Sequence, residues 1–181
     1  MPYTILWETA MKSIYKTRIP QLIIRFATEN DTPLILEFIK KLAIYEKLKD
    51  QVSANTELLK KTLFGNRKVA EVILAEFNNK PVAFSLFFHN FSTFLGQPGL
   101  YIEDLFVEED MRGKGIGKEI LAFLARLAIE RGCGRMEWWV LDWNTPAINF
   151  YRKMGAQAMD EWTVYRLDGK ELNIMAHFSG G

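Results

Sequence analysis

The sequence has few of the residues that form disulfides and metal centres. It contains one cysteine, Cys133, and two histidines, His89 and His177, among 181 residues. A single cysteine excludes an internal disulfide and fits a reducing compartment, so we expect a cytoplasmic protein. The three residues lie far apart in the sequence, so we expect no metal site. Cys133 stands between two glycines in a turn-like stretch, which argues against a cysteine nucleophile.

The sequence also lacks a charge excess and a long apolar run. Its 23 basic and 22 acidic residues leave a formal net charge of +1, so no overall field favours nucleic acid or an anionic membrane. No run of 18 apolar residues is present, so no transmembrane helix is expected. The first 20 residues lack the long apolar core and cleavage site of a signal peptide. We therefore expect neither a nucleic-acid nor a membrane partner.

The composition predicts one domain with an appendage. Hydrophobic residues make up 49% of the chain, which is enough for one well-packed core. No repeat or linker rich in proline, glycine or serine divides the sequence. Residues 1–20 stand apart from the pattern that follows, as a short helix, a strand or a disordered leader. We expect them to form a peripheral extension and residues 21–181 to form a single domain.

Apolar periodicity predicts a mixed sheet covered by helices, an α/β fold of the α+β type. The Asn79-Lys80 pair predicts a hairpin between two strands. Antiparallel strands come first and two strand-to-helix units follow. Strands are expected at residues 22–27, 69–78, 81–92, 100–107 and 136–141, helices at 32–45, 55–63, 114–131 and 146–154, and a final hairpin at 162–169 and 170–176.

A glycine-rich loop follows the strand expected at residues 100–107. Its sequence is RGKGIG, residues 112–117, and it leads directly into a strongly apolar helix. Alternating glycines let a ligand approach the backbone, and the free N–H groups at a helix N-terminus favour an anion. Arg112 adds a positive fork that suits phosphate. The loop therefore predicts a phosphate or pyrophosphate site.

Three other interpretations of this loop are weaker. A Walker loop would need Ser or Thr after Gly117-Lys118, where Glu119 stands instead. A dinucleotide fingerprint would need its third glycine one position later, after the first strand of a βαβ unit. A glycine-rich turn without a ligand is the third possibility.

The spacing Arg-x-x-Gly-x-Gly, met by Arg112, Gly115 and Gly117, resembles the acetyl-CoA loop of the GNAT N-acetyltransferase superfamily. In that family the amides of the loop hold the coenzyme's pyrophosphate, and the element order above is similar to its fold. The resemblance implies acetyl-CoA as co-substrate. It also implies a mostly antiparallel twisted sheet flanked by helices.

Further stretches are similar to the spermidine/spermine N-acetyltransferases, a subfamily with diamine and thialysine acetylating members. They are DWNTPAINFYRKMGA at residues 142–156, YIEDLFV at 101–107 and KLAIYEK at 41–47. The resemblance covers residues 22–176 and implies direct transfer of acetyl to a primary amine of a small molecule, a polyamine, diamine or thialysine-like compound. It also implies a homodimer, often with exchanged C-terminal strands.

Alternatives to this function stay open. A non-catalytic acyl-CoA-binding module could use the same fold, and so could a protein N-terminal acetyltransferase. The subfamily's polyamine enzymes place two consecutive acids in the tail after the last helix. Asp160-Glu161 stands close to that place with a shorter spacing, so the identity of the amine is not fixed.

Amine acetylation needs a group that takes a proton and a group that supplies one. A lysine-like amine is unprotonated in only roughly one molecule in 10³ at neutral pH, so a base must take its proton. Glu103, with Asp104 beside it, interrupts an apolar strand, and we expect Glu103 to act as base through water. The resemblance implies that Tyr151 lies at the coenzyme sulfur and protonates the leaving thiolate. An exposed strand end and a tyrosine packed on a helix are the plain alternatives.

The resemblance also assigns binding roles to other residues. Coenzyme contacts are expected from Leu105, Phe106, Val107, Arg112, Gly113, Lys114, Gly115, Ile116, Gly117, Lys118, Asn144, Ala147 and Tyr151. The acceptor is expected to meet Tyr45, Glu46, Glu103, Asp104, Glu137, Trp138 and Trp139. Aromatic rings beside carboxylates suit an ammonium group.

Overall fold

The computed structural model describes residues 14–178, which fall into two compact units that divide after Trp143. The first unit holds a six-stranded sheet in the order β1-β2-β3-β4-β5-β6 together with helices α2, α3 and α4. The second unit holds helices α5 and α6. No helix among the described residues is long and apolar enough to span a membrane.

The sheet is antiparallel from β1 to β5, and β6 joins the edge of β5 in parallel. The turn between β3 and β4 is made by Asn78 and Asn79, both with positive φ, which are residues that tolerate this conformation. The turn therefore lies one residue earlier than the sequence predicted. The strands are β1 Tyr15–Lys16, β2 Leu22–Phe26, β3 Glu71–Phe77, β4 Lys80–Ser92, β5 Gln97–Val107 and β6 Arg135–Trp138.

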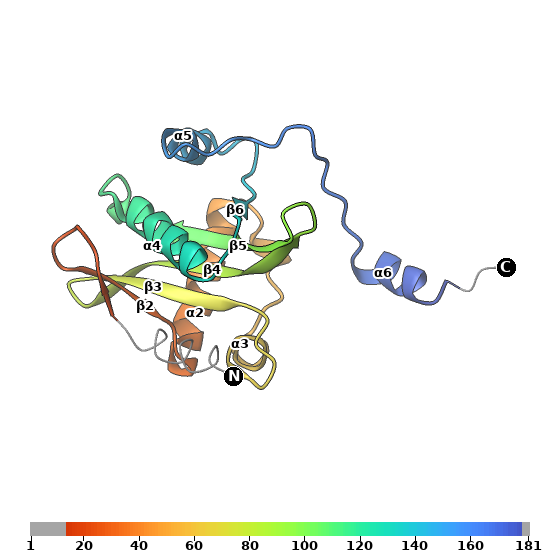
Figure 1. Cartoon of the computed structure of the whole chain (residues 1–181). Helices are drawn as coiled ribbons and strands as arrows, with labels where there is room; N and C mark the ends of the chain where they lie inside the picture. The colour runs from red at the N-terminus through yellow and green to blue at the C-terminus, as the bar shows by residue number, and fades with distance from the viewer. Residues whose placement is uncertain (1–13, 179–181) are drawn as a thin grey trace, which may run out of the picture. The chain divides into compact units, whose positions relative to one another are not determined.

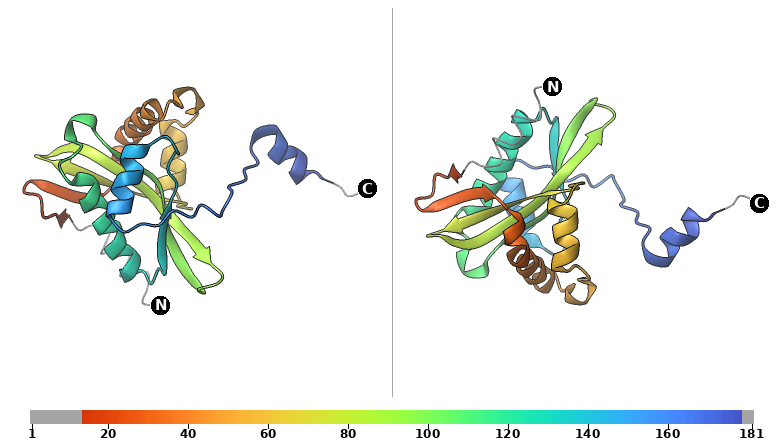
Figure 2. Two further views of the ribbon diagram at one scale, coloured as in Figure 1. Left: turned by 90° about the horizontal axis from the view of Figure 1, so that it is seen from above. Right: turned by 90° about the horizontal axis from the view of Figure 1, so that it is seen from below.

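Among residues 14–178, two helices cover one face of the sheet, and one helix covers the other (Figure 1). Helices α2, Thr32–Tyr45, and α3, Thr56–Phe64, lie on the lower face, and α4, Ile116–Glu130, lies on the upper face (Figure 2). Pro33 occupies the start of α2, where its missing N–H removes no hydrogen bond. The three helices confirm the predicted helical segments at these places.

The core on the α2 side is built on stacked aromatic rings. Phe38 of α2 lies parallel to Phe84 of β4, with ring centroids 5.3 Å apart, and Phe106 of β5 packs on Phe38 at 6.0 Å. The rest of this cluster is aliphatic and comes from α2, α3 and β3: Ile35, Leu59, Leu63, Val72 and Leu74. The core therefore fixes the end of β5 against α2, and that junction positions the site described below.

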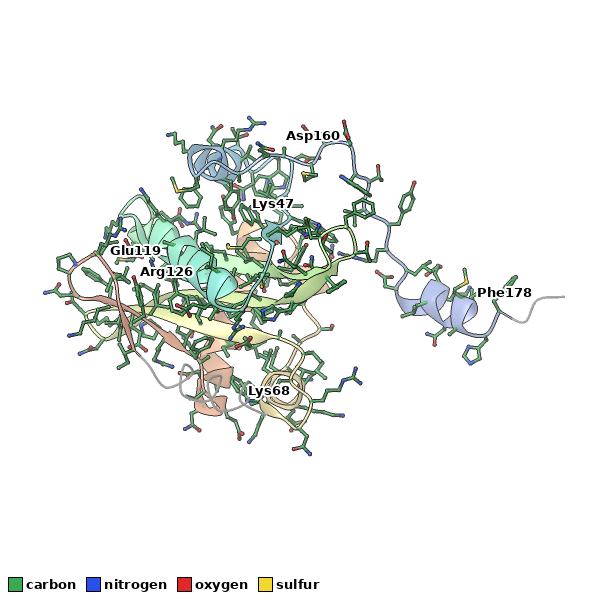
Figure 3. The ribbon with its side chains drawn as sticks, viewed as in Figure 1. Lys47, Lys68, Glu119, Arg126, Asp160 and Phe178 are labelled. Atoms are coloured by element: carbon green, nitrogen blue, oxygen red, sulfur yellow. The ribbon has the colours of Figure 1, made fainter. Side chains whose placement is uncertain are left out.

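Part of the N-terminal extension belongs to the sheet. Tyr15 and Lys16 form β1 at its edge, and the N–H of Arg18 donates to Glu119 at 3.4 Å. The guanidinium of Arg126 lies 4.3 Å from the ring of Tyr15, and Figure 3 labels Glu119 and Arg126 along α4. Residues 1–13 lie outside the described residues, so the predicted boundary after residue 20 stays a prediction.

The second unit departs from the prediction. Helix α5, Thr145–Lys153, was expected and ends before Gly155, which has a φ of +88°. The hairpin predicted at residues 162–176 is wrong, because residues 162–168 form no strand and Gly169–Ala176 is helix α6. The segment KELNIMA is rich in helix formers, and its short apolar pattern fits both periods. Strand β6 is also shorter than predicted and ends at Trp138.

A network of ion pairs ties the start of α2 to the sheet. Arg25 of β2 donates twice to Asp31, at 2.8 Å each, and once to Glu76 of β3 at 2.7 Å. The hydrogen bonds from Arg25 lower the pKa of the Asp31 carboxyl to about 2. Asp31 also accepts from the backbone N–H of Thr28 at 2.7 Å. The network fixes the direction in which α2 runs toward Glu46.

We predict that Asp31→Asn lowers the free energy of unfolding by about 1–2 kcal/mol at pH 7. The folded pKa of Asp31 lies below its ordinary value of 3.8, so its stabilisation is present above that value and is lost as the pH falls through about 2. Urea unfolding at pH 7 and at pH 2.5 measures the difference. Equal destabilisation at both pH values would contradict an ionic origin.

Candidate active site

Strand β5 carries the two adjacent carboxylates, and its pairing with β4 contains a β-bulge at this point. Leu86 faces Asp104, whereas the next residue, Phe87, faces Ile102, so Glu103 is the extra residue. A bulge leaves the extra residue unpaired and shifts the alternation of side chains. The two carboxylates are therefore not divided between the faces as a regular strand would divide them.

Asp104 faces the side of the sheet that α2 covers, because its partner Leu86 packs against the α2 core cluster. The pKa of the Asp104 carboxyl is raised to about 7, first by burial and then by the negative charges of Glu103 and Glu46. Glu46 follows the end of α2, and burial raises the pKa of its carboxyl too. Glu46, Glu103 and Asp104 form one group, called the acidic cluster below.

The acidic cluster has no cation of its own among the described residues. The ion pairs between residues 14 and 178 involve none of its three carboxylates. In the same part of the chain, no three His, Cys, Asp or Glu side chains are placed to hold a metal ion. An uncompensated anionic group that is partly shielded from water favours a positively charged ligand.

Tyr101 is a residue that the sequence analysis missed. Its ring packs on Phe88 at 5.0 Å and meets Trp139 edge-on at 5.8 Å. Burial raises the pKa of its phenol, and the charges of Glu103 and Glu137 add to this effect. The phenol therefore stays protonated next to the acidic cluster. Its position two residues before Glu103, in a strand, was the available signal.

The acceptor residues predicted on β6 and directly after it differ in how well they are placed to contact a ligand. Glu137 is paired with Arg135 at 2.9 Å and accepts from the side-chain amide of Asn90 at 2.8 Å. These contacts compensate its charge. Trp138 is partly buried, whereas Trp139 is 59% exposed and lies against Tyr101. Trp139 is therefore the better placed of the two tryptophans to contact a ligand.

The glycine loop has the backbone that its sequence requires. Gly113 and Gly115 have φ values of +75° and +85°, a region that side chains with a Cβ rarely adopt. Gly115 is the N-cap residue of α4 and supplies no side chain to cap it. Gly117 lies in the first turn, and Lys114 and Lys118 are exposed. Amides and lysines at this helix start can hold an anion.

Two predicted contact residues can act only through their backbone. Ile116 is 2% exposed and Phe106 is 6% exposed, so both side chains belong to the core.

Strand β6 pairs with β5 only from Gly99 to Ile102, whereas β4 continues to pair with β5 as far as Val107. Within the first unit, the end of β5 therefore has one edge without a strand partner. That edge offers main-chain hydrogen-bonding groups to a ligand.

Arg112 links the glycine loop to the end of α2. Its Nε donates to the carbonyl of Val107 at 3.0 Å, and its guanidinium lies 4.4 Å from the ring of Tyr45. The ring of Trp143 packs on Tyr45 at 5.9 Å, and the ammonium of Lys47 lies 5.4 Å from Trp143. The structure thus brings Arg112, which is predicted to bind phosphate, into contact with Tyr45, which is predicted to contact the acceptor. Arg112 therefore lies against Tyr45, and Glu46 follows Tyr45 in the chain.

The remaining predicted residues lie in the second unit. The side chain of Asn144 accepts from the N–H of Ala147 at 3.3 Å and so caps α5. Tyr151 lies in the same helix, and its ring is 5.4 Å from that of Phe150. Glu103 and Tyr151 are therefore carried by different units. The role of acid for Tyr151 and that of base for Glu103 stay predictions.

The chain is similar to known acetyltransferases over most of its length. The model of the Acetyltransferase (GNAT) family matches residues 40–156. Thialysine N-epsilon-acetyltransferase of Bos taurus is 35% identical over 166 residues, which cover 86% of this chain and 97% of that protein. L-ornithine N5-acetyltransferase of Arabidopsis thaliana is 34% identical over 197 residues, which cover 84% of this chain and 86% of that protein.

Solved structures share the fold. An integron cassette protein from the mobile metagenome of V. cholerae superposes with a TM-score of 0.74 at 28% identity, covering 87% of this chain and 99% of that one. An aminoglycoside acetyltransferase from an uncultured soil metagenomic sample superposes with a TM-score of 0.70 at 23% identity, covering 83% and 97%. The family model and the curated relatives show the family, and the solved structures share the fold. The chain belongs to the acetyltransferase (GNAT) family and is an acetyltransferase.

Proposed function

We propose that this enzyme transfers acetyl from acetyl-CoA directly to a primary amine of a small molecule: a polyamine, a diamine or a basic amino acid of the thialysine type. The observation that carries the proposal is the acidic cluster of Glu46, Glu103 and Asp104, which lacks a cation among the described residues. A substrate ammonium would compensate this charge. The relatives named for thialysine and ornithine act on amines of this kind.

The coenzyme would follow the edge of β5 and the glycine loop. Loop amides from Gly113 to Lys118 would hold the pyrophosphate, with Arg112 and Lys114 supplying positive charge. The unpaired edge of β5 at Leu105, Phe106 and Val107 supports a role for those amides toward the pantetheine arm and the thioester oxygen. On α5, the second unit would contribute contacts from Asn144 and Ala147.

The acceptor would lie on the α2 side of β5. Its ammonium would meet the acidic cluster, and the rings of Tyr45, Tyr101 and Trp139 would surround its carbon chain. Trp138 would lie behind them on β6. Glu137 is already paired with Arg135, so we assign it a secondary role at the rim.

The direct test is release of free thiol from acetyl-CoA in the presence of different amines. We expect turnover with at least one of spermidine, putrescine, thialysine, ornithine and lysine, and none with amino-terminal peptides. Peptide turnover alone would favour an N-terminal acetyltransferase. Binding of acetyl-CoA without turnover on any amine would favour a non-catalytic module and contradict the proposal.

We predict that Tyr151→Phe lowers kcat at least ~10-fold, because the leaving thiolate would lose its proton donor. Steady-state kinetics with the best amine measure the effect. Tyr15→Phe, which removes a phenol oxygen from β1 at an edge of the sheet, is the matched control and should keep the wild-type rate. An unchanged kcat in Tyr151→Phe would remove Tyr151 from the mechanism.

We also propose a cytoplasmic homodimer. Residues 162–168 form no strand, yet they carry large exposed apolar side chains: Trp162 at 72%, Val164 at 54%, Tyr165 at 92% and Leu167 at 50%. An alternating apolar segment of this kind gains hydrogen bonds and burial when it joins a sheet edge. A second copy of the chain offers such an edge at β6. The single cysteine supports a reducing location.

We predict that light scattering at micromolar concentration gives twice the chain mass of 21.0 kDa. Val164→Pro should shift the mass toward the monomer, because proline removes an N–H donor from a paired strand. Val164→Ile keeps the strand propensity and serves as the control. A wild-type monomer, or a Val164→Pro dimer of unchanged stability, would contradict the strand-mediated dimer.

A further inference from the structure

Asp104 is a partly buried titratable group that the sequence-derived mechanism leaves without a chemical step. We propose that Asp104, and not the more exposed Glu103, is the carboxylate that takes the proton from the substrate amine, while Glu103 and Glu46 tune it by their charge. The inference rests on the proposed function and deepens it. It names the proton acceptor of the same site.

The backbone holds Asp104 more firmly than its neighbour. Asp104 is paired with Leu86 across the ladder, and its carbonyl accepts from the hydroxyl of Ser85 at 2.7 Å. Ser85 is fully buried, so this contact anchors the strand in the core. Glu103 is the extra residue of the bulge and is exposed. A proton acceptor must keep its geometry, and Asp104 has the more constrained position.

The charges that act on the Asp104 carboxyl are all negative. Glu103 contributes from the same strand and Glu46 from the end of α2, while the facing residues of β4, Leu86 and Ser85, are uncharged. Beyond this cluster, the phenol of Tyr101 feels Glu103 and Glu137, and Glu137 is compensated by Arg135. Asp104 therefore holds a proton more readily than an ordinary aspartate does.

The proton affinity of Asp104 suits a base that takes a proton from an amine near neutral pH. A base works best when its pKa lies near the operating pH, and burial with the two neighbouring charges brings the pKa of Asp104 to about 7. An arriving ammonium favours the carboxylate form, so the substrate itself prepares the base. When the amine becomes a neutral amide, that positive charge disappears. Asp104 then favours its protonated form again, so the proton does not return to the nitrogen during the transfer.

The ammonium R–NH₃⁺ gives one proton to the Asp104 carboxylate, and the lone pair of R–NH₂ attacks the thioester carbon. The C–N bond forms, the C–S bond breaks, and the sulfur leaves with its electron pair. The second proton leaves the nitrogen as the amide forms, and the thiolate gains a proton to become the coenzyme thiol. Asp104 then releases its proton to water.

The test compares pH profiles of kcat and kcat/KM for wild type, Asp104→Asn and Glu103→Gln. The wild-type kcat/KM should lose activity as the pH falls through about 7. Asp104→Asn should lose ~100-fold or more in kcat at pH 7, lose this acid limb and recover activity toward pH ~10, where the amine deprotonates unaided. Glu103→Gln should keep the limb but shift it to lower pH, because one repelling charge is gone.

The control variant is Asp50→Asn, an exposed aspartate beyond the end of α2, which should behave as wild type. The inference is overturned if Glu103→Gln shows the large loss and the recovery at high pH while Asp104→Asn keeps its rate. A loss in Asp104→Asn without any change of profile would indicate a structural role and would also overturn it.

A second readout does not depend on turnover. Carbon-13 NMR of the aspartate carboxyl groups should show one resonance that titrates near pH 7 in wild type, is absent from Asp104→Asn and titrates at lower pH in Glu103→Gln and Glu46→Gln. An ordinary aspartate titration for Asp104 would overturn the inference. If wild type releases no thiol with any amine, the proposed function itself fails, and the NMR titration still decides whether Asp104 holds the proton.

Discussion

The register of β5 is the constraint on which the site depends. One extra residue, Glu103, is accommodated in the pairing with β4, and the parallel pairing with β6 ends just before it at Ile102. From that point to Val107 the strand keeps one partner, and its other edge has no strand partner among the described residues of the first unit. We propose that the same short stretch supplies backbone groups for a coenzyme arm and carboxylates for an amine.

Contacts away from the site hold this arrangement in place. Helix α2 is fixed against the sheet by the stacked rings of Phe38 and Phe84 and by the ion pairs of Arg25. The charge of Glu46, at the end of this helix, therefore acts on Asp104. Three carboxylates near one another without a cation destabilise the folded chain, since like charges repel and those of Glu46 and Asp104 are partly removed from water. Such a cost is typical of functional sites, where the ligand supplies the missing charge. Binding of an ammonium would offset the repulsion between these carboxylates.

The sequence predicted the elements better than their contacts. The apolar stripe of α2 was sufficient to predict that helix, and the glycines at 113 and 115 were sufficient to predict the loop. Apolar periodicity and the need for positive φ are local properties of the chain. The bulge at Glu103 was invisible, since it depends on the register with a strand formed by distant residues. For the same reason the sequence missed Tyr101 and the hydrogen bond from Asn90 to Glu137. The wrong final hairpin came from a short segment that suits helix and strand equally.

The central claim is that coenzyme and amine meet along the open edge of β5, beside the acidic cluster. A crystal structure with a bisubstrate analogue, coenzyme A joined through an acetyl bridge to a polyamine or basic amino acid, tests it most directly. We expect the pyrophosphate on the amides of residues 113–118 and the bridging nitrogen within hydrogen-bonding distance of the Asp104 carboxyl or one water away. A nitrogen placed away from Glu46, Glu103 and Asp104, with the pyrophosphate still in the loop, would contradict it.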